Sequence, residues 1–180
     1  TLSAAISGGG GVTIQSAGLT GNAGGTVSSQ NTPIVLTATA GALDIIDTIN
    51  SHGGTITINA GTTITLGPAP LASAGGKIAL SSANGMTLAG PITTSGGQFT
   101  AQVSGAGALF LQNDLTTSGG NVTMTTANGL LQATAGSDIN ASGGAGSSSV
   151  FIESADGAQD VLLGGTLSSG AGGITVRAGN

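Results

Sequence analysis

The sequence TTSGGNVTMTTANG, residues 116–129, decides the fold because a close relative of it occurs earlier in the chain. The earlier copy, TTSGGQFTAQVSGAG, begins at Thr93. Each copy contains a glycine pair, a short stretch in which apolar and polar residues alternate, and a second turn of small residues. Alternation with a period of two is typical of a β-strand with one buried face. The two copies therefore predict a chain built from repeated turn–strand–turn units.

The small-residue turn that closes this unit recurs along nearly the whole chain. Its glycines are separated by 20 to 28 residues, with a mean of 23. These turn glycines are Gly18, Gly41, Gly61, Gly85, Gly107, Gly129, Gly157 and Gly179. A second marker, a Ser that precedes a glycine pair, recurs with the same period. It occurs at Ser51, Ser73, Ser95, Ser118, Ser142 and Ser169. Because two separate markers share one period, the repeat dominates the interpretation of the fold.

The segments between these markers have the residue pattern of β-strands. In most units an apolar residue stands five positions before the turn glycine, and we expect it to face the core. These residues are Leu36, Ile56, Leu80, Met124, Ile152 and Ile174. A second apolar pair follows the turn, as at Ile64 and Leu66, and a third short segment is anchored by residues such as Leu71. Each unit therefore contains three short strands, and no segment has helical apolar spacing.

Three strands in about 23 residues cannot bury an apolar face alone, but stacked copies can pair in parallel with the units above and below. The expected fold is an all-β, right-handed parallel β-helix, or β-solenoid, its hand following from that of parallel crossovers. We expect seven to eight rungs of three short strands each, in a single solenoid segment over residues 1–180. We interpret this segment as a fragment of a longer repeat array. We interpret residues 142–149 as a surface insertion and residues 26–33 as a bulged loop.

The composition argues against several classes of function. The chain has two Lys and Arg residues in total and a formal net charge of −5, so it lacks the cations that bind nucleic acid. It contains no Cys, which leaves no disulfide framework or thiolate metal site. No apolar run approaches the roughly 18 residues of a membrane-spanning helix. We therefore expect no nucleic acid partner and no membrane insertion.

The charged residues do not form a clear catalytic constellation. Three acids, Glu153, Asp156 and Asp160, fall within one unit, and clustered carboxylates on a β-helix are typical of polysaccharide hydrolases. However, Asp156 occupies a turn position, and Arg177 is expected one rung away, close enough to form a surface ion pair with it. The remaining acids are Asp44, Asp47, Asp114 and Asp138. We expect no catalytic residue.

We also expect no metal and no cofactor. A calcium-binding solenoid needs an Asp at a fixed offset from each glycine pair, and this chain has none. Lys77 follows a glycine pair but not within a phosphate-binding loop, and His52 stands alone at a corner, where we expect it to be solvated. The stretch TITINAGTTITL suggests an ice-binding face, but later units lack its threonines. Phe110 and Phe151 are out of phase with their apolar neighbours, which indicates either outward rings that could contact a sugar or a partner chain, or a slip in register.

The phrases TTSGGNVTMTTANG and ASAGGKIALSSANGMTLAGPITTSGG resemble the repeat regions of filamentous haemagglutinin-like exoproteins. These are large bacterial adhesins that are secreted by the two-partner route. The resemblance implies a right-handed β-helical shaft at the cell surface, acting in adhesion, biofilm formation or contact-dependent competition. The sequence does not contain the Asn-Pro-Asn-type motifs of that family's secretion domain. No catalytic or binding residue of the family can be carried over to this chain.

The leading hypothesis is therefore a non-catalytic shaft or spacer of an extracellular or cell-surface adhesin. Its partners would be neighbouring repeats of the same chain, with a surface carbohydrate or protein ligand left open. The alternative is a self-assembling protomer whose copies stack end to end into a fibre or matrix. A polysaccharide-active enzyme is a more distant third possibility.

Overall fold

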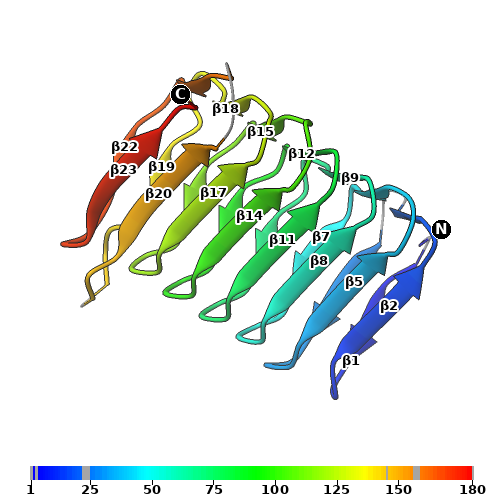
Figure 1. Cartoon of the computed structure of the whole chain (residues 1–180). Helices are drawn as coiled ribbons and strands as arrows, with labels where there is room; N and C mark the ends of the chain where they lie inside the picture. The colour runs from blue at the N-terminus through cyan, green and yellow to red at the C-terminus, as the bar shows by residue number, and fades with distance from the viewer. Residues whose placement is uncertain (1, 3, 22–24, 145, 156–158, 180) are drawn as a thin grey trace.

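The computed structural model describes residues 2, 4–21, 25–144, 146–155 and 159–179. In these ranges the chain forms strands β1 to β23 and no helix, and hence no helix that could span a membrane. The strands wind into a parallel β-solenoid of about eight turns, with three strands in each turn (Figure 1). Successive turns lie side by side along one axis from the N-terminus to the C-terminus. The predicted all-β parallel solenoid with three strands per rung is confirmed.

Every third strand belongs to the same sheet, so the solenoid has three sheets in which all neighbouring strands are parallel. The wide sheet contains β2 (Val12–Ser16), β5 (Ile34–Ala38), β8 (Ile56–Ala60), β11 (Ile78–Ser82), β14 (Phe99–Val103), β17 (Val122–Thr126), β20 (Ser149–Ser154) and β23 (Gly173–Arg177). The middle sheet contains β3 (Leu19–Gly21), β6 (Leu43–Ile45), β9 (Thr63–Leu66), β12 (Gly85–Leu88), β15 (Leu109–Leu111), β18 (Leu131–Ala133) and β21 (Val161–Leu163). The narrow sheet contains β1 (Ile6–Gly8), β4 (Thr26–Ser29), β7 (Thr48–Asn50), β10 (Leu71–Ala72), β13 (Ile92–Thr93), β16 (Leu115–Thr116), β19 (Ile139–Asn140) and β22 (Leu167–Ser168).

The core consists of columns, each made of the residues that stand at one position on successive turns. The wide sheet has two inward columns that are almost entirely apolar, and a third of mixed small and polar residues such as Ala38, Ser82 and Thr126. The first is Val12, Ile34, Ile56, Ile78, Phe99, Val122, Val150 and Ile174. The second is Ile14, Leu36, Ile58, Leu80, Ala101, Met124, Ile152 and Val176. Since like stacks on like, each turn buries the apolar face of the one before it.

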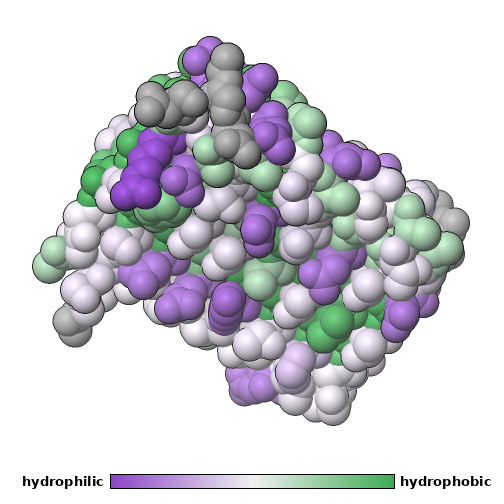
Figure 2. All heavy atoms as spheres, in the orientation of Figure 1, coloured by the Kyte–Doolittle hydropathy of each residue, from purple (hydrophilic) through white to green (hydrophobic). Residues whose placement is uncertain are grey.

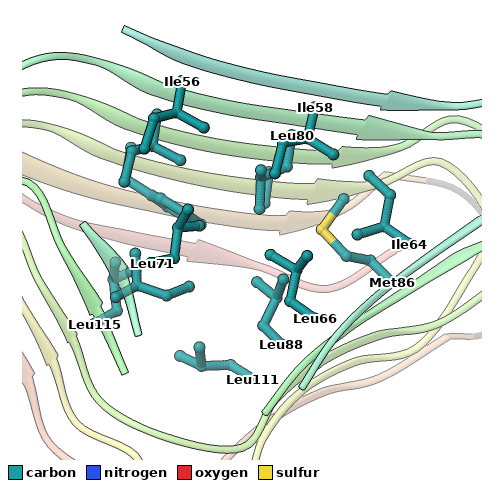
Figure 3. Close-up of a cluster of buried hydrophobic side chains, with 14 of the residues drawn as sticks. Ile56, Ile58, Ile64, Leu66, Leu71, Leu80, Met86, Leu88, Leu111 and Leu115 are labelled. Carbon is teal, nitrogen blue, oxygen red and sulfur yellow. The ribbon is translucent and has the colours of Figure 1, made fainter. Parts of the chain in front are cut away.

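The other two sheets complete this interior. The middle sheet supplies the column Leu19, Leu43, Ile64, Met86, Leu109, Leu131 and Val161, and the column Gly21, Ile45, Leu66, Leu88, Leu111, Ala133 and Leu163. The narrow sheet supplies Ile6, Val27, Ile49, Leu71, Ile92, Leu115, Ile139 and Leu167. Figure 3 shows side chains from all three sheets meeting in one apolar interior. These five columns are the physical basis of the fold.

The core residues expected from the sequence do not all belong to one column. Leu36, Leu80, Met124 and Ile152 share the second column of the wide sheet and are buried. Ile56 and Ile174 stand two positions earlier, in the first column. Ile56 is buried, but Ile174, on the last described strand, is 45% exposed. Ile56 therefore faces the core as predicted, and both residues stand at inward positions, but in a different column because the distance from strand to turn glycine varies from turn to turn.

The turn glycines lie at or next to the corner that connects the wide sheet to the middle sheet, but at different distances from the strand end. Gly61 directly follows β8, whereas Gly107 comes four residues after the end of β14 at Val103. Gly85 is already the first residue of β12. Gly157 lies outside the described residues. The shared corner was therefore visible in the sequence, but the glycines do not mark the register within it.

The glycine pairs occupy the corner between the narrow and wide sheets. At four of these corners the residue before the pair and its first glycine both have positive φ, as at His52 (49°) and Gly53 (120°). This is the left-handed region, where glycine has no steric cost. In the early turns Ser51 and Ser73 donate hydroxyl hydrogen bonds across the corner to glycine carbonyls.

The second marker shifts by one residue in later turns. The hydroxyl groups of Thr94 and Thr117 make the bonds that Ser51 and Ser73 make earlier. The expected equivalents, Ser95 and Ser118, instead take the left-handed position, with φ of 51° and 50°. The list of serine markers therefore mixed two structural positions. These four corners therefore share one hydrogen bond, whose hydroxyl comes from either Ser or Thr.

The expected insertion is present and the expected bulge is not. Asn140 and Val150 are ten positions apart, whereas Thr116 and Val122, their counterparts in the turn before, are six apart. The additional residues fall within the segment 142–149, as predicted. In contrast, residues 26–29 form the regular strand β4, whose Val27 is 2% exposed. The interpretation of residues 26–33 as a bulged loop was therefore wrong.

Candidate functional site

The outer face of the wide sheet is the broadest regular surface of the molecule. It carries two outward columns of mostly small and polar side chains (Figure 2). The first is Thr13, Val35, Thr57, Ala79, Thr100, Thr123, Phe151 and Thr175. The second is Gln15, Thr37, Asn59, Ser81, Gln102, Thr125, Glu153 and Arg177. In these columns, charge and aromatic character are confined to the last turns.

A shallow hollow of about 240 Å³ lies where β14, β17 and β20 end. Its polar wall consists of Gln102, Thr125 and Glu153, which stand beside one another on successive turns. Neighbouring parallel strands are about 4.8 Å apart, so an amide, a hydroxyl and a carboxylate repeat at that spacing. The remaining lining residues are Val103, Thr126, Ala127 and Ala155. Among residues that the structure describes, this hollow is the best-formed candidate site.

An ion pair and an aromatic ring border the hollow on the C-terminal side. A guanidinium nitrogen of Arg177 lies 3.6 Å from a carboxylate oxygen of Glu153. The same guanidinium lies over the ring of Phe151, 5.6 Å from its centre, a distance at which cation–π attraction operates. Phe151 is half-buried and points outward, which is the first of the two alternatives that the sequence left open. Phe110 likewise points outward, on the middle sheet between Thr87 and Gln132.

The strand register expected for Arg177 was wrong. The turn glycines suggested that Arg177 stands beside Ala155 and reaches Asp156, but the strand register pairs Arg177 with Glu153. The cause is again the unequal distance between strand and turn glycine. Asp156 itself lies outside the described residues. Among described residues, Arg177 forms its ion pair with Glu153, and the expected contact with Asp156 stays a prediction.

Three other acids form hydrogen bonds between turns. Asp47 is 7% exposed, and its carboxylate accepts a hydrogen bond from the amide of Gly25 at 3.0 Å. The carboxylate of Asp114 accepts from the amide of Asp138 at 3.0 Å, and that of Asp138 accepts from the amide of Thr166 at 2.7 Å. These carboxylates satisfy backbone amides at the corner between the middle and narrow sheets. They therefore contribute to the scaffold.

The other charged candidates are dispersed. Asp44 points outward from the centre of β6, and Asp160 is exposed directly before β21. Lys77 is exposed directly before β11. His52 is exposed, but its Nδ1 lies 2.9 Å from the carbonyl oxygen of Ser29, so the imidazole has a partner on the preceding turn. Its ring is therefore not simply solvated as expected. Within the described ranges, no three His, Asp or Glu residues group as metal ligands would.

The chemistry of the hollow is that of hydrogen bonding. Among the residues that the structure describes, its lining offers the Gln102 amide, the Thr125 hydroxyl and one carboxylate, Glu153. Glycoside hydrolysis by the usual route requires two carboxyl groups on opposite sides of the scissile bond, and the described part of the lining supplies one. Sequence reasoning did not find Gln102 and Thr125, although their place out of phase with the apolar residues marks them as outward.

Comparison of the chain with models of protein families, with curated proteins and with solved structures finds no match. Function is therefore inferred from the geometry of the chain itself.

Proposed function

We propose that this chain is a non-catalytic segment of the shaft of a large extracellular adhesin-type protein at a bacterial surface. The observation that carries the proposal is the continuity of the five inward columns along the solenoid. Each turn contacts the turns beside it, so length is added by repetition without a change in cross-section. A rod of this kind is suited to holding a distal binding region away from the cell.

The surface chemistry also favours a spacer. The chain is only 5% charged, and three of its acids are engaged by backbone amides of the scaffold. The outward columns of the wide sheet are mainly hydroxyl and amide side chains, which stay hydrated without attracting a charged partner. The repeat phrases that resemble haemagglutinin-like exoproteins support placement outside the cell. These features together favour a spacer that projects a distal region over a catalytic role.

A spacer should stay folded when one whole turn is removed. It should not stay folded when part of a turn is removed, because the strands then no longer pair in register. Ile78 and Phe99 occupy the same position on neighbouring turns, so deletion of residues 78–98 removes one complete turn and joins Lys77 to Phe99 in register. We expect a folded rod that is shorter by about 4.8 Å in small-angle scattering and keeps its resistance to protease. Deletion of residues 78–87 removes part of a turn and should unfold the chain. Equal damage from both deletions would contradict the modular shaft.

The location and the absence of catalysis need separate tests. Antibodies raised against the chain should label intact cells of the source organism, and labelling only after lysis would oppose the extracellular placement. Incubation with a panel of polysaccharides should give no turnover. Glu153→Gln is the matched variant, because it removes the carboxylate of the hollow and keeps its size. Turnover by the original chain that Glu153→Gln abolishes would replace the shaft with a hydrolase.

A further inference from the structure

The polar wall of the hollow belongs to a column that carries a hydrogen-bonding side chain on every described turn. This is the second outward column of the wide sheet, Gln15, Thr37, Asn59, Ser81, Gln102, Thr125, Glu153 and Arg177. The first outward column, two positions earlier on each strand, is interrupted by apolar residues such as Val35 and Phe151. A line of polar groups therefore runs along the solenoid axis, and the hollow lies on its course.

The hollow lies within the solenoid and not at either end of it. Its strands β14, β17 and β20 each pair with a described strand on both sides. Gln102 is exposed, and Thr125 and Glu153 are half-buried, so their polar atoms are accessible. The inward hydroxyl of Thr126 donates to the carbonyl oxygen of Gly129. In contrast, the side chains of Gln102 and Thr125 have no hydrogen-bond partner among the described residues, which leaves both for a ligand.

The three polar groups suit a ligand that both donates and accepts hydrogen bonds. The Gln102 amide and the Thr125 hydroxyl do both, whereas the Glu153 carboxylate only accepts. Neighbouring hydroxyl groups on a sugar ring supply donors and acceptors together. Ala127 and Ala155 also line the hollow, and their small side chains leave space for the ring and contact its C–H groups. The lining therefore matches a sugar.

The spacing of the wall favours an extended sugar chain over a peptide. Because Gln102, Thr125 and Glu153 stand on neighbouring strands, they recur about every 4.8 Å along the axis. An extended peptide advances about 3.3 Å per residue, so its same-side groups recur about every 6.6 Å and do not match the wall. Each sugar of an extended glucan or xylan advances its chain by nearly the spacing of one turn. Such a chain can therefore place one sugar on each turn.

The charge of the site favours a neutral chain. The protein has a formal net charge of −5, and the carboxylate of Glu153 lines the hollow, so both repel a polymer of uronic acids or phosphates. Arg177 borders the hollow, but its guanidinium is paired with Glu153 and lies over the ring of Phe151. It is therefore not presented to an anionic ligand.

We propose that the hollow binds a neutral, extended polysaccharide chain along the solenoid axis, with one sugar beside each of Gln102, Thr125 and Glu153. The amide and the hydroxyl donate to and accept from sugar hydroxyl groups, and the carboxylate accepts from an adjacent pair of them. No bond of the polysaccharide is broken. The site goes beyond the shaft function, because it lets the side of the rod contact carbohydrate.

The first test compares oligosaccharides by titration calorimetry. Cellohexaose is neutral and extended, and we expect it to bind the chain. Maltohexaose contains the same sugars in a curved chain, and it should bind at least about tenfold more weakly because it loses hydrogen bonds on one or more turns. A hexamer of galacturonic acid carries negative charge and should not bind. Cellotriose should bind nearly as well as cellohexaose, whereas cellobiose, which spans two turns, should bind more weakly.

The second test changes the wall of the hollow. The double variant Gln102→Leu, Thr125→Val removes the amide and the hydroxyl and keeps side chains of similar size. It should bind cellohexaose at least about tenfold more weakly than the original chain does. The matched control Thr100→Val, Thr123→Val alters outward residues two positions earlier on the same strands, outside the hollow, and should bind normally. Circular dichroism verifies that both variants are folded.

Nuclear magnetic resonance locates the ligand on the original chain. Cellohexaose should shift the backbone amide signals of β14, β17 and β20 and leave those of the narrow sheet unchanged. Shifts confined to the narrow or middle sheet would overturn the proposal.

Other results would also overturn it. These are a chain that does not bind cellohexaose, equal affinity for maltohexaose or the galacturonic acid hexamer, equal affinity for cellobiose and cellotriose, or a double variant that binds as well as its control. A protease-resistant rod that binds no oligosaccharide would remove the carbohydrate site and leave the shaft function standing. A chain that fails to form a rod would remove the shaft function, so the two failures are distinguishable.

Discussion

The carbonyl oxygen of Gly54 lies 2.0 Å from the place that a Cβ atom on Gly76 would occupy. The same contact recurs one turn later, where a Cβ on Gly97 would stand 2.1 Å from the carbonyl oxygen of Gly76. In these pairs the second glycine is therefore required by the backbone of the neighbouring turn, whereas the first is required by its positive φ. The glycine pair therefore forms the corner and also lets the backbones of neighbouring turns approach closely.

Replacing Gly97 with Ala should destabilise the solenoid. The new methyl group must displace the backbone of the turn before it, and overpacking of this kind costs about 1–3 kcal/mol. Urea unfolding followed by circular dichroism measures the loss. Gly10→Ala is the matched control, because no atom lies within 4 Å of its added Cβ. Equal midpoints for the two variants would show that the turns do not approach as closely as described.

The buried corner hydroxyl gives a second prediction. Thr94 is 0% exposed, and its hydroxyl donates to the carbonyl oxygen of Gly97. Thr94→Val keeps the shape and removes the donor, which should lower the free energy of unfolding by about 1 kcal/mol. Thr123→Val is the control on the outer face of β17, where the effect should be near zero. A Thr94→Val chain as stable as this control would mean that the corner bond contributes nothing to folding.

The fold was predictable from the sequence because it depends on features that repeat. Strand alternation and the glycine pairs recur in almost every turn, so errors at single positions did not change the result. The register was less accessible, since it depends on corner lengths that vary. Ile56 was assigned to the column of Leu36, although Ile58 is the residue that stands there. An error in the length assumed for one corner is enough to shift the predicted register of a strand relative to its neighbour.

The candidate site was harder to predict than the fold for the same reason. Gln102, Thr125 and Glu153 lie in one column only when three separate corners have been counted correctly. Glu153 was considered as a candidate because it is an acid. Gln102 and Thr125 were not considered, because they are neutral. The residue opposite Arg177 in the sheet was misassigned through the same uncertainty in corner length. The contacts between turns could therefore be assigned only from the structure, whereas the alternation within each strand could be assigned from the sequence.

The apolar columns give a third prediction. Leu88 is 0% exposed and stands between Leu66 and Leu111 in the middle sheet. Leu88→Ala should cost about 2–5 kcal/mol, because it removes buried methyl groups and leaves a cavity between turns. The control Leu162→Ala makes the same change at a residue that is 45% exposed, and it should cost far less. Thermal unfolding of the two variants compares them, and similar melting temperatures would contradict a packed interior.

The ion pair of Glu153 and Arg177 should contribute little to stability. The Arg177 side chain is 64% exposed and that of Glu153 is 27% exposed, so water and salt screen the 3.6 Å contact between them. Exposed pairs of this type are worth about 0–1 kcal/mol. A double-mutant cycle with Glu153→Gln, Arg177→Gln and both together isolates the coupling energy from other effects of each change. We expect a value below about 1 kcal/mol that falls further as salt is raised. A coupling above about 2 kcal/mol would mean that the pair is held more rigidly than its exposure implies, and the cation–π contact with Phe151 would then be the reason to examine first.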